Sequence, residues 1–132
     1  MESAVEGTRT VAQLLAAARS RLERLTPEQA HAAMSKGALL VDIRSDNQRA
    51  VDGLIAGARV VPRNVLEWRL DPACPSRDPE LGRPEARVIL LCDEGFQSSL
   101  AAATARSFGL AHATDVIGGF RAWRAAGLPI ER

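Results

Sequence analysis

The chain has 132 residues, a length that suits one domain with a buried core. Its 17 basic and 16 acidic residues give a formal charge of +1, and it has only three Phe and two Trp. This balance, without a basic run, argues against nucleic acid and membrane surfaces as partners. Two cysteines are too few for a disulfide framework, and neither a signal peptide nor an apolar run of roughly 20 residues is seen, so we expect a cytoplasmic protein.

Two helices are predicted before the first strand. Thr10 and Gln13 form a capping-box pattern, and apolar residues then recur at helical spacing as far as Leu25. The segment Thr26-Pro27-Glu28-Gln29 restarts the chain with a second cap, and Gly37 is placed to end that helix. We therefore expect an amphipathic helical extension over residues 1–24 and the main domain over residues 25–132.

The rest of the chain alternates short apolar runs with helical segments. Strands are predicted at 38–43, 59–61, 88–91 and 113–117, and helices at 45–53, 64–70, 98–108 and 120–126. Residues 71–84 hold four prolines and are expected to form a surface excursion. This alternation predicts an α/β fold of three layers, with a central parallel sheet flanked by helices on both faces.

One cysteine stands where such folds bind ligands, at the carboxyl end of a strand. Cys92 follows the run 88–91, and Asp42 and Arg44 follow the first strand at the same expected edge. The loop after Cys92 leads into a helix and consists of Asp93, Glu94, Gly95, Phe96, Gln97 and Ser98. Backbone N–H groups of such a loop, together with the helix dipole, would stabilise a thiolate or a persulfide. Cys92 is therefore the candidate nucleophile.

Three separated motifs resemble the rhodanese family of sulfurtransferases in its single-domain form. The first is Leu40-Val41-Asp42-Ile43-Arg44 followed by Gly53-Leu54-Ile55-Ala56-Gly57-Ala58 and Pro62. The second is the loop that Cys92 opens, and the third is Gly118-Gly119-Phe120-Arg121-Ala122-Trp123 with Gly127-Leu128-Pro129. In order and at domain-scale spacing, the three together indicate the family.

The resemblance implies a rhodanese-like fold and a ping-pong reaction. Cys92 would take a sulfane sulfur from a donor, thiosulfate or another persulfide donor, and pass it to a thiophilic acceptor. The backbone N–H groups of Asp93 through Gln97 would surround the outer sulfur, and the side chains of the loop would point outward and tune the choice of substrate. No cofactor and no metal are implied, and the partners would be small-molecule or protein sulfur donors and acceptors.

Asp93 and Glu94 are unusual at the mouth of such a site, where basic or neutral residues often stand in enzymes that use thiosulfate. At about 6 Å and an effective dielectric near 20, Coulomb's law gives roughly 3 kcal/mol of repulsion per pair of unit charges. The sequence therefore predicts weak use of thiosulfate and a different physiological donor.

Alternative functions remain open at this point. A cysteine-dependent phosphatase would need an arginine at the end of the loop, where Gln97 and Ser98 stand. A non-catalytic interaction module is the other alternative, because the N-terminal helix could pack on its own domain or join two copies as a homodimer. Cys74 could form a disulfide with Cys92, although an incidental thiol is the simpler interpretation. Asp42 is expected to hold the site structurally by accepting backbone N–H groups.

Overall fold

The structure is a computed structural model that describes residues 7–132. Side-chain caps fix the starts of the first three helices, because Thr10, Thr26 and Ser45 each form a capping box with the glutamine three residues later. The elements in chain order are α1 Val11–Arg19, α2 Pro27–Met34, β1 Leu39–Asp42, α3 Asp46–Asp52, β2 Arg59–Val60, the 3₁₀ turn η1 Arg63–Val65, α4 Leu66–Leu70, β3 Val88–Leu91, α5 Gln97–Ser107, β4 Thr114–Asp115 and α6 Gly119–Ala125.

The four strands form one parallel sheet in the order β2-β1-β3-β4. Leu40 pairs with Ile89 in the centre, and Leu90 pairs with Asp115 toward the edge strand. An isolated parallel bridge between Leu25 and Val116 continues this edge. Because all strands run the same way, β1, β3 and β4 end at one side of the sheet, and that side carries the candidate site.

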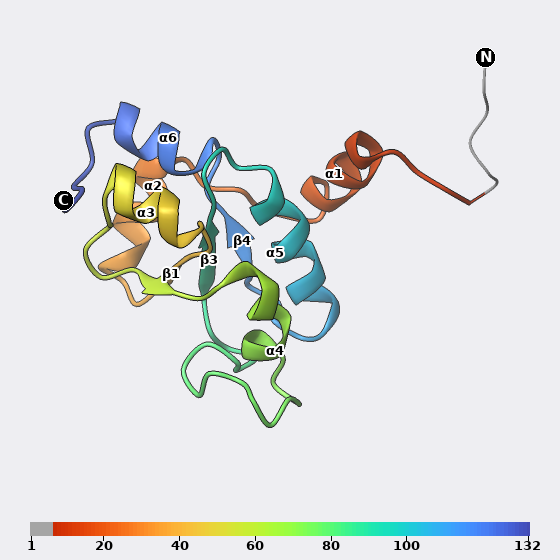
Figure 1. Cartoon of the computed structure of the whole chain (residues 1–132). Helices are drawn as coiled ribbons and strands as arrows, with labels where there is room; N and C mark the ends of the chain where they lie inside the picture. The colour runs from red at the N-terminus through yellow and green to blue at the C-terminus, as the bar shows by residue number, and fades with distance from the viewer. Residues whose placement is uncertain (1–6) are drawn as a thin grey trace, which may run out of the picture.

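Helices cover both faces of the sheet, as Figure 1 shows, with α4 and α5 on one face and α2, α3 and α6 on the other. The sheet has a hydrophobic core on each face, and alternate residues of β3 point into the two cores. Val88 and Leu90 pack on the side of α4 and α5, while Ile89 and Leu91 pack with Phe120 and Trp123. Cys92 continues the first set, so its side chain is turned toward α5. The expected α/β fold with a parallel sheet is confirmed.

Two expectations about local structure differ from the observed fold. The first helix ends at Arg19 instead of continuing to Leu25, because Leu25 pairs with Val116 as a strand residue. The excursion at 71–84 is not wholly a surface segment, since Leu81 is completely buried in the core. Of the two positions left open for the N-terminal helix, the structure shows packing on its own domain: α1 contacts α5 and buries Ala18, and a homodimer through this helix is not supported. The division at residue 25 stays a prediction.

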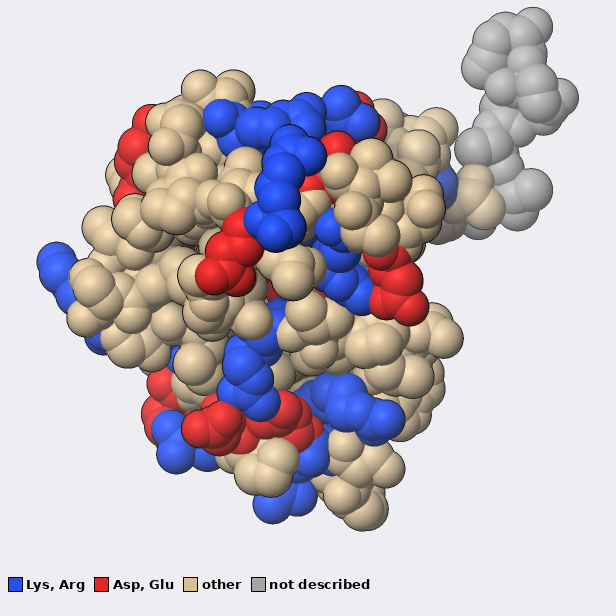
Figure 2. All heavy atoms as spheres, turned by 60° about the vertical axis from the view of Figure 1, so that its left-hand side comes forward, with Lys and Arg blue, Asp and Glu red and all other residues tan. Residues whose placement is uncertain are grey.

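Charged side chains of both signs are interspersed over the face shown in Figure 2, in line with the net charge of +1. Arg59, for example, pairs with both Asp78 and Glu80 at 2.7 Å. Among residues 7–132, no helix is both long enough and apolar enough to cross a membrane.

Candidate active site

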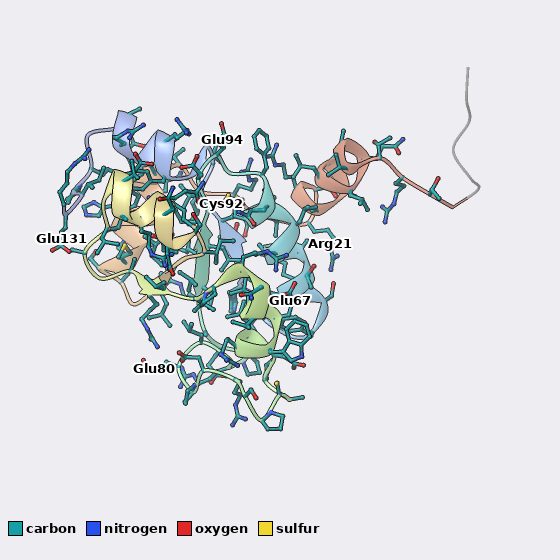
Figure 3. The ribbon with its side chains drawn as sticks, in the orientation of Figure 1. Arg21, Glu67, Glu80, Cys92, Glu94 and Glu131 are labelled. Atoms are coloured by element: carbon teal, nitrogen blue, oxygen red, sulfur yellow. The ribbon has the colours of Figure 1, made fainter. Side chains whose placement is uncertain are left out.

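Cys92 lies directly after β3, beneath the loop that connects this strand to α5 (Figure 3). Its side chain is buried, yet it lines a hollow of about 230 Å³ together with Gln48, Asp93, Glu94, Phe96 and Gln97. A second hollow of about 400 Å³ adjoins the first, because Gln48 and Gln97 line both. Cys92 therefore lies at the wall of a surface hollow of mixed polar and apolar lining.

The carbonyl groups of the loop are held from outside the loop. Phe120 N–H donates to the Cys92 carbonyl at 2.8 Å, and Arg121 N–H donates to the Asp93 carbonyl at 3.1 Å. This contact is close because Gly119 comes next to the loop backbone, where a Cβ would lie 2.5 Å from the Cys92 carbonyl oxygen. The glycine pair of the C-terminal motif therefore has a definite structural role: it lets α6 reach and orient the loop.

The N–H groups of the loop are left free for a ligand. Gly95 N–H donates to Cys92 Sγ at 3.1 Å, which is possible because Gly95 adopts a φ of +87°. Within residues 7–132, the N–H groups of Asp93, Glu94, Phe96 and Gln97 donate to no protein acceptor. Because peptide N–H and C=O groups point in opposite directions, holding carbonyls outside turns N–H groups inward. Such a cradle of N–H groups is suited to holding an anion.

A buried polar network lies beneath the sulfur. Ser98 Oγ is 3.3 Å from Cys92 Sγ and donates to Asp115 Oδ2 at 2.7 Å, and Ser99 Oγ reaches the same oxygen at 2.8 Å. Arg24 Nε completes the set by donating to Asp115 Oδ1 at 2.8 Å. Asp115 is fully buried, and both of its carboxylate oxygens accept hydrogen bonds. Ser98 therefore points inward to the network, whereas the side chains of Glu94, Phe96 and Gln97 are exposed.

The mouth of the site is less acidic than the loop sequence alone predicts. Arg121 Nε lies 2.9 Å from Asp93 Oδ2 and 3.9 Å from Glu94 Oε2. The hydrogen bond to Asp93, and then the negative charge of that carboxylate, raises the pKa of Arg121, which therefore stays charged at any working pH. Figure 3 places Glu94 at the outer edge of the loop. The repulsion expected from Asp93 and Glu94 is therefore reduced by an arginine that the C-terminal motif brings to the loop.

Asp42 and Arg44 form a separate buried pair. Arg44 Nη2 donates to Asp42 Oδ2 and to the Gly53 carbonyl, both at 2.8 Å, and its guanidinium lies 3.8 Å from the centre of the Phe120 ring. Asp42 also accepts the backbone N–H of Arg44 at 3.0 Å, the kind of structural role expected for it. The pair therefore supports the sheet edge and has no hydrogen bond to the loop.

The segment that carries Cys74 lies apart from the active-site loop. In Figure 1, the segment 71–84, which carries Cys74, and the loop that follows Cys92 lie at opposite ends of the sheet. Both cysteines are free thiols. This separation argues against a disulfide between them without a large rearrangement. The described part of the chain has no group of three or more side chains suited to holding a metal ion.

Sequence reasoning missed four residues that surround the loop, namely Arg19, Arg24, Ser99 and Asp115. Three of them contact the Gly95 carbonyl: Arg19 Nη2 at 2.8 Å, Arg24 Nη2 at 3.1 Å and Ser99 Oγ at 3.3 Å. A signal for Asp115 was available, because it is the one carboxylate in the predicted strand 113–117, which ends at the same sheet edge as Cys92. No such signal marked the two arginines: the packing of α1 against α5 brings Arg19 to the loop, and the bridge between Leu25 and Val116 places Arg24 beside Asp115.

Comparison with known proteins agrees with this geometry. A family model described as a rhodanese-like domain matches residues 26–126. A thiosulfate sulfurtransferase GlpE from Stutzerimonas stutzeri is 34% identical over 102 residues, covering 77% of this chain and 84% of the relative. A protein of the same name from Haemophilus influenzae is 32% identical over 110 residues, covering 83% of this chain and 94% of the relative.

Solved structures share the fold. A protein of unknown function from Rhodopseudomonas palustris, described as a possible tyrosine phosphatase, has a TM-score of 0.86 and 35% identity, with 99% of each chain covered. A homodimeric polysulfide-sulfur transferase from Wolinella succinogenes has a TM-score of 0.70 and 24% identity, covering 92% of this chain and 86% of the other.

The chain belongs to the rhodanese-like domain family, and its curated relatives place it among the single-domain sulfurtransferases of that family. The expected rhodanese-type sulfurtransferase is thus confirmed, and the two alternatives are not favoured. Ser98 stands at the loop end, where a phosphatase would need an arginine. The arginines that do touch the loop bind the Gly95 carbonyl and the Asp93 carboxylate.

Proposed function

We propose that Cys92 is the nucleophile of this sulfurtransferase and carries the transferred sulfur as a persulfide. The observation that supports the proposal best is the loop itself: the Cys92 and Asp93 carbonyls are held from outside, Gly95 N–H donates to Sγ, and four further loop N–H groups have no acceptor among the described residues. A terminal persulfide sulfur bears negative charge, and free N–H groups at a helix N-terminus are the donors that such an anion needs.

In the first half-reaction, the Cys92 thiolate attacks the sulfane sulfur of the donor. A new S–S bond forms at Sγ, and the donor's own bond to that sulfur breaks, with its electron pair leaving on sulfite when the donor is thiosulfate. In the second half-reaction, a thiophilic acceptor attacks the outer sulfur of the persulfide. The bond to Sγ breaks and its electron pair returns to Cys92 as thiolate, so no external oxidant or reductant is required.

The donor is proposed to be thiosulfate or another sulfane-sulfur compound, in accord with the names of the relatives. The side chains of Asp93, Glu94, Phe96 and Gln97 line the hollow and are proposed to contact donor and acceptor. Both cysteines are free thiols, which suits the reducing cytoplasm that we propose as the location.

The experiment is mass spectrometry of the intact protein after exposure to thiosulfate, paired with steady-state transfer of sulfur to cyanide. We expect wild type to gain the mass of one sulfur atom and to turn over. Cys92→Ser should do neither, whereas Cys74→Ser, the matched control at the other thiol, should behave as wild type. Turnover by Cys92→Ser, or an adduct that depends on Cys74, would refute the proposal.

A further inference from the structure

Arg19 joins the N-terminal helix to the active-site loop. It is the last residue of α1 and stands before residue 26, where the match to the family model begins. Its Nη2 donates to the Gly95 carbonyl at 2.8 Å and its Nε donates to Ser99 Oγ at 3.1 Å. Its guanidinium also lies 5.7 Å from the centre of the Phe96 ring. One side chain therefore contacts both the loop and the first turn of α5.

The bond to the Gly95 carbonyl determines which way the next N–H group points. The carbonyl of Gly95 and the N–H of Phe96 belong to one planar trans peptide, so they point in opposite directions. Arg19 and Arg24 hold the carbonyl from outside, at 2.8 and 3.1 Å, which turns the Phe96 N–H away from them. A carbonyl that accepts charge-assisted bonds also polarises its peptide and makes that N–H a stronger donor.

The two arginines differ in how their charge is used. Arg24 is paired with the buried Asp115, which balances its charge. Arg19 forms no ion pair with a carboxylate among the described residues, so its positive charge is not cancelled on the outer side of the cradle. A positive charge next to the loop favours a negatively charged sulfur within the loop.

We propose that Arg19 is a positioning residue for sulfur transfer: from helix α1 it fixes the Gly95–Phe96 peptide so that the cradle is complete when Cys92 carries the sulfur. This inference rests on the proposed function of Cys92. It extends the functional unit of the protein to a helix that precedes the segment matched by the family model.

The test compares Arg19→Ala and Arg19→Lys with Arg21→Ala in sulfur transfer from thiosulfate to cyanide. Arg21 is the matched control, because it lies two residues beyond Arg19 and, as Figure 3 shows, is well away from Cys92. Among the described residues, its side chain hydrogen-bonds to Ser107 Oγ at 3.2 Å and makes no bond to the loop. We expect Arg19→Ala to lower kcat about tenfold with KM within about twofold, because the lost bonds act on the charged sulfur and not on the donor at the mouth. Arg19→Lys keeps the charge without the planar fork, so its loss should be smaller.

Rescue separates positioning from folding. Millimolar methylguanidinium added to Arg19→Ala should restore part of kcat, while melting curves confirm that the variant is folded under assay conditions. A wild-type kcat in Arg19→Ala, or an equal loss in Arg21→Ala, would overturn this inference while Cys92→Ser stays inactive. Activity in Cys92→Ser would instead overturn the proposed function, and this inference with it.

Discussion

Replacing Asp115 with asparagine removes the charge at the centre of the polar network below Cys92. The carboxylate is fully buried and accepts bonds from Arg24, Ser98 and Ser99. Loss of one partner of a buried ion pair costs about 3–5 kcal/mol, and asparagine keeps one acceptor oxygen, which returns about 1 kcal/mol. We therefore expect the free energy of unfolding to fall by about 3 kcal/mol. Sulfur transfer per folded molecule should fall as well, because Ser98 and Arg24 lose the group that orients them.

Asp42→Asn provides the matched control. The carboxylate of the Asp42–Arg44 pair is as buried as that of Asp115 and lies at the same end of the sheet, with an N–O distance of 2.8 Å like that of Arg24 and Asp115, but the pair makes no hydrogen bond to the loop. Urea unfolding measures the stability of both variants, and turnover is measured without urea at a temperature where both are folded. We expect similar losses of stability, with a loss of turnover about fivefold larger for Asp115→Asn. Equal turnover in the two variants would refute the role of the network.

Two further predictions concern the loop and its mouth. Gly95→Ala places a Cβ 2.8 Å from the Gly118 nitrogen, at a residue whose φ is +87°. We therefore expect the free energy of unfolding, measured in urea, to fall by about 2–4 kcal/mol and turnover to be almost lost. A variant with wild-type stability and activity would contradict the backbone conformation assigned to Gly95. Arg121→Ala leaves Asp93 and Glu94 without their cation, so the KM for the thiosulfate dianion should rise severalfold with little change in kcat. The rise in KM should be smaller in high salt, which screens the charges. An unchanged KM would show that Arg121 does not offset the negative charge at the mouth.

The fold can be predicted from sequence wherever local chemistry determines it. Thr10, Thr26 and Ser45 mark three helix starts through capping boxes, and the continuous apolar run of β3 indicates a strand buried on both faces. The position of Cys92 follows from the rule that parallel strands deliver ligand-binding residues at their carboxyl ends. These signals need only a few neighbouring residues, and the structure reproduces them.

The remainder depends on contacts between distant parts of the chain. Leu25 continues the helical spacing of α1, yet its pairing with Val116 draws it into the edge of the sheet. Arg19 and Gly95 are 76 positions apart, and nothing in either local sequence indicates that they meet. In the sequence, Arg121 stands 28 positions from Asp93, so the loop residues alone make the mouth look more acidic than it is. Such long-range polar contacts have no periodicity that a sequence pattern could reveal.

The contact of Arg19 and Arg24 with the Gly95 carbonyl also affects which residues a shortened form of the protein must retain. A fragment cut to residues 26–126, the span that the family model matches, would retain the sheet, the thiol and the whole loop sequence. It would lack both guanidinium groups that hold the loop peptide, and Asp115 would be left buried without its cation. For this chain, the start of the family-model match and the first residue that contacts the loop peptide differ by seven residues, from Arg19 to Leu25.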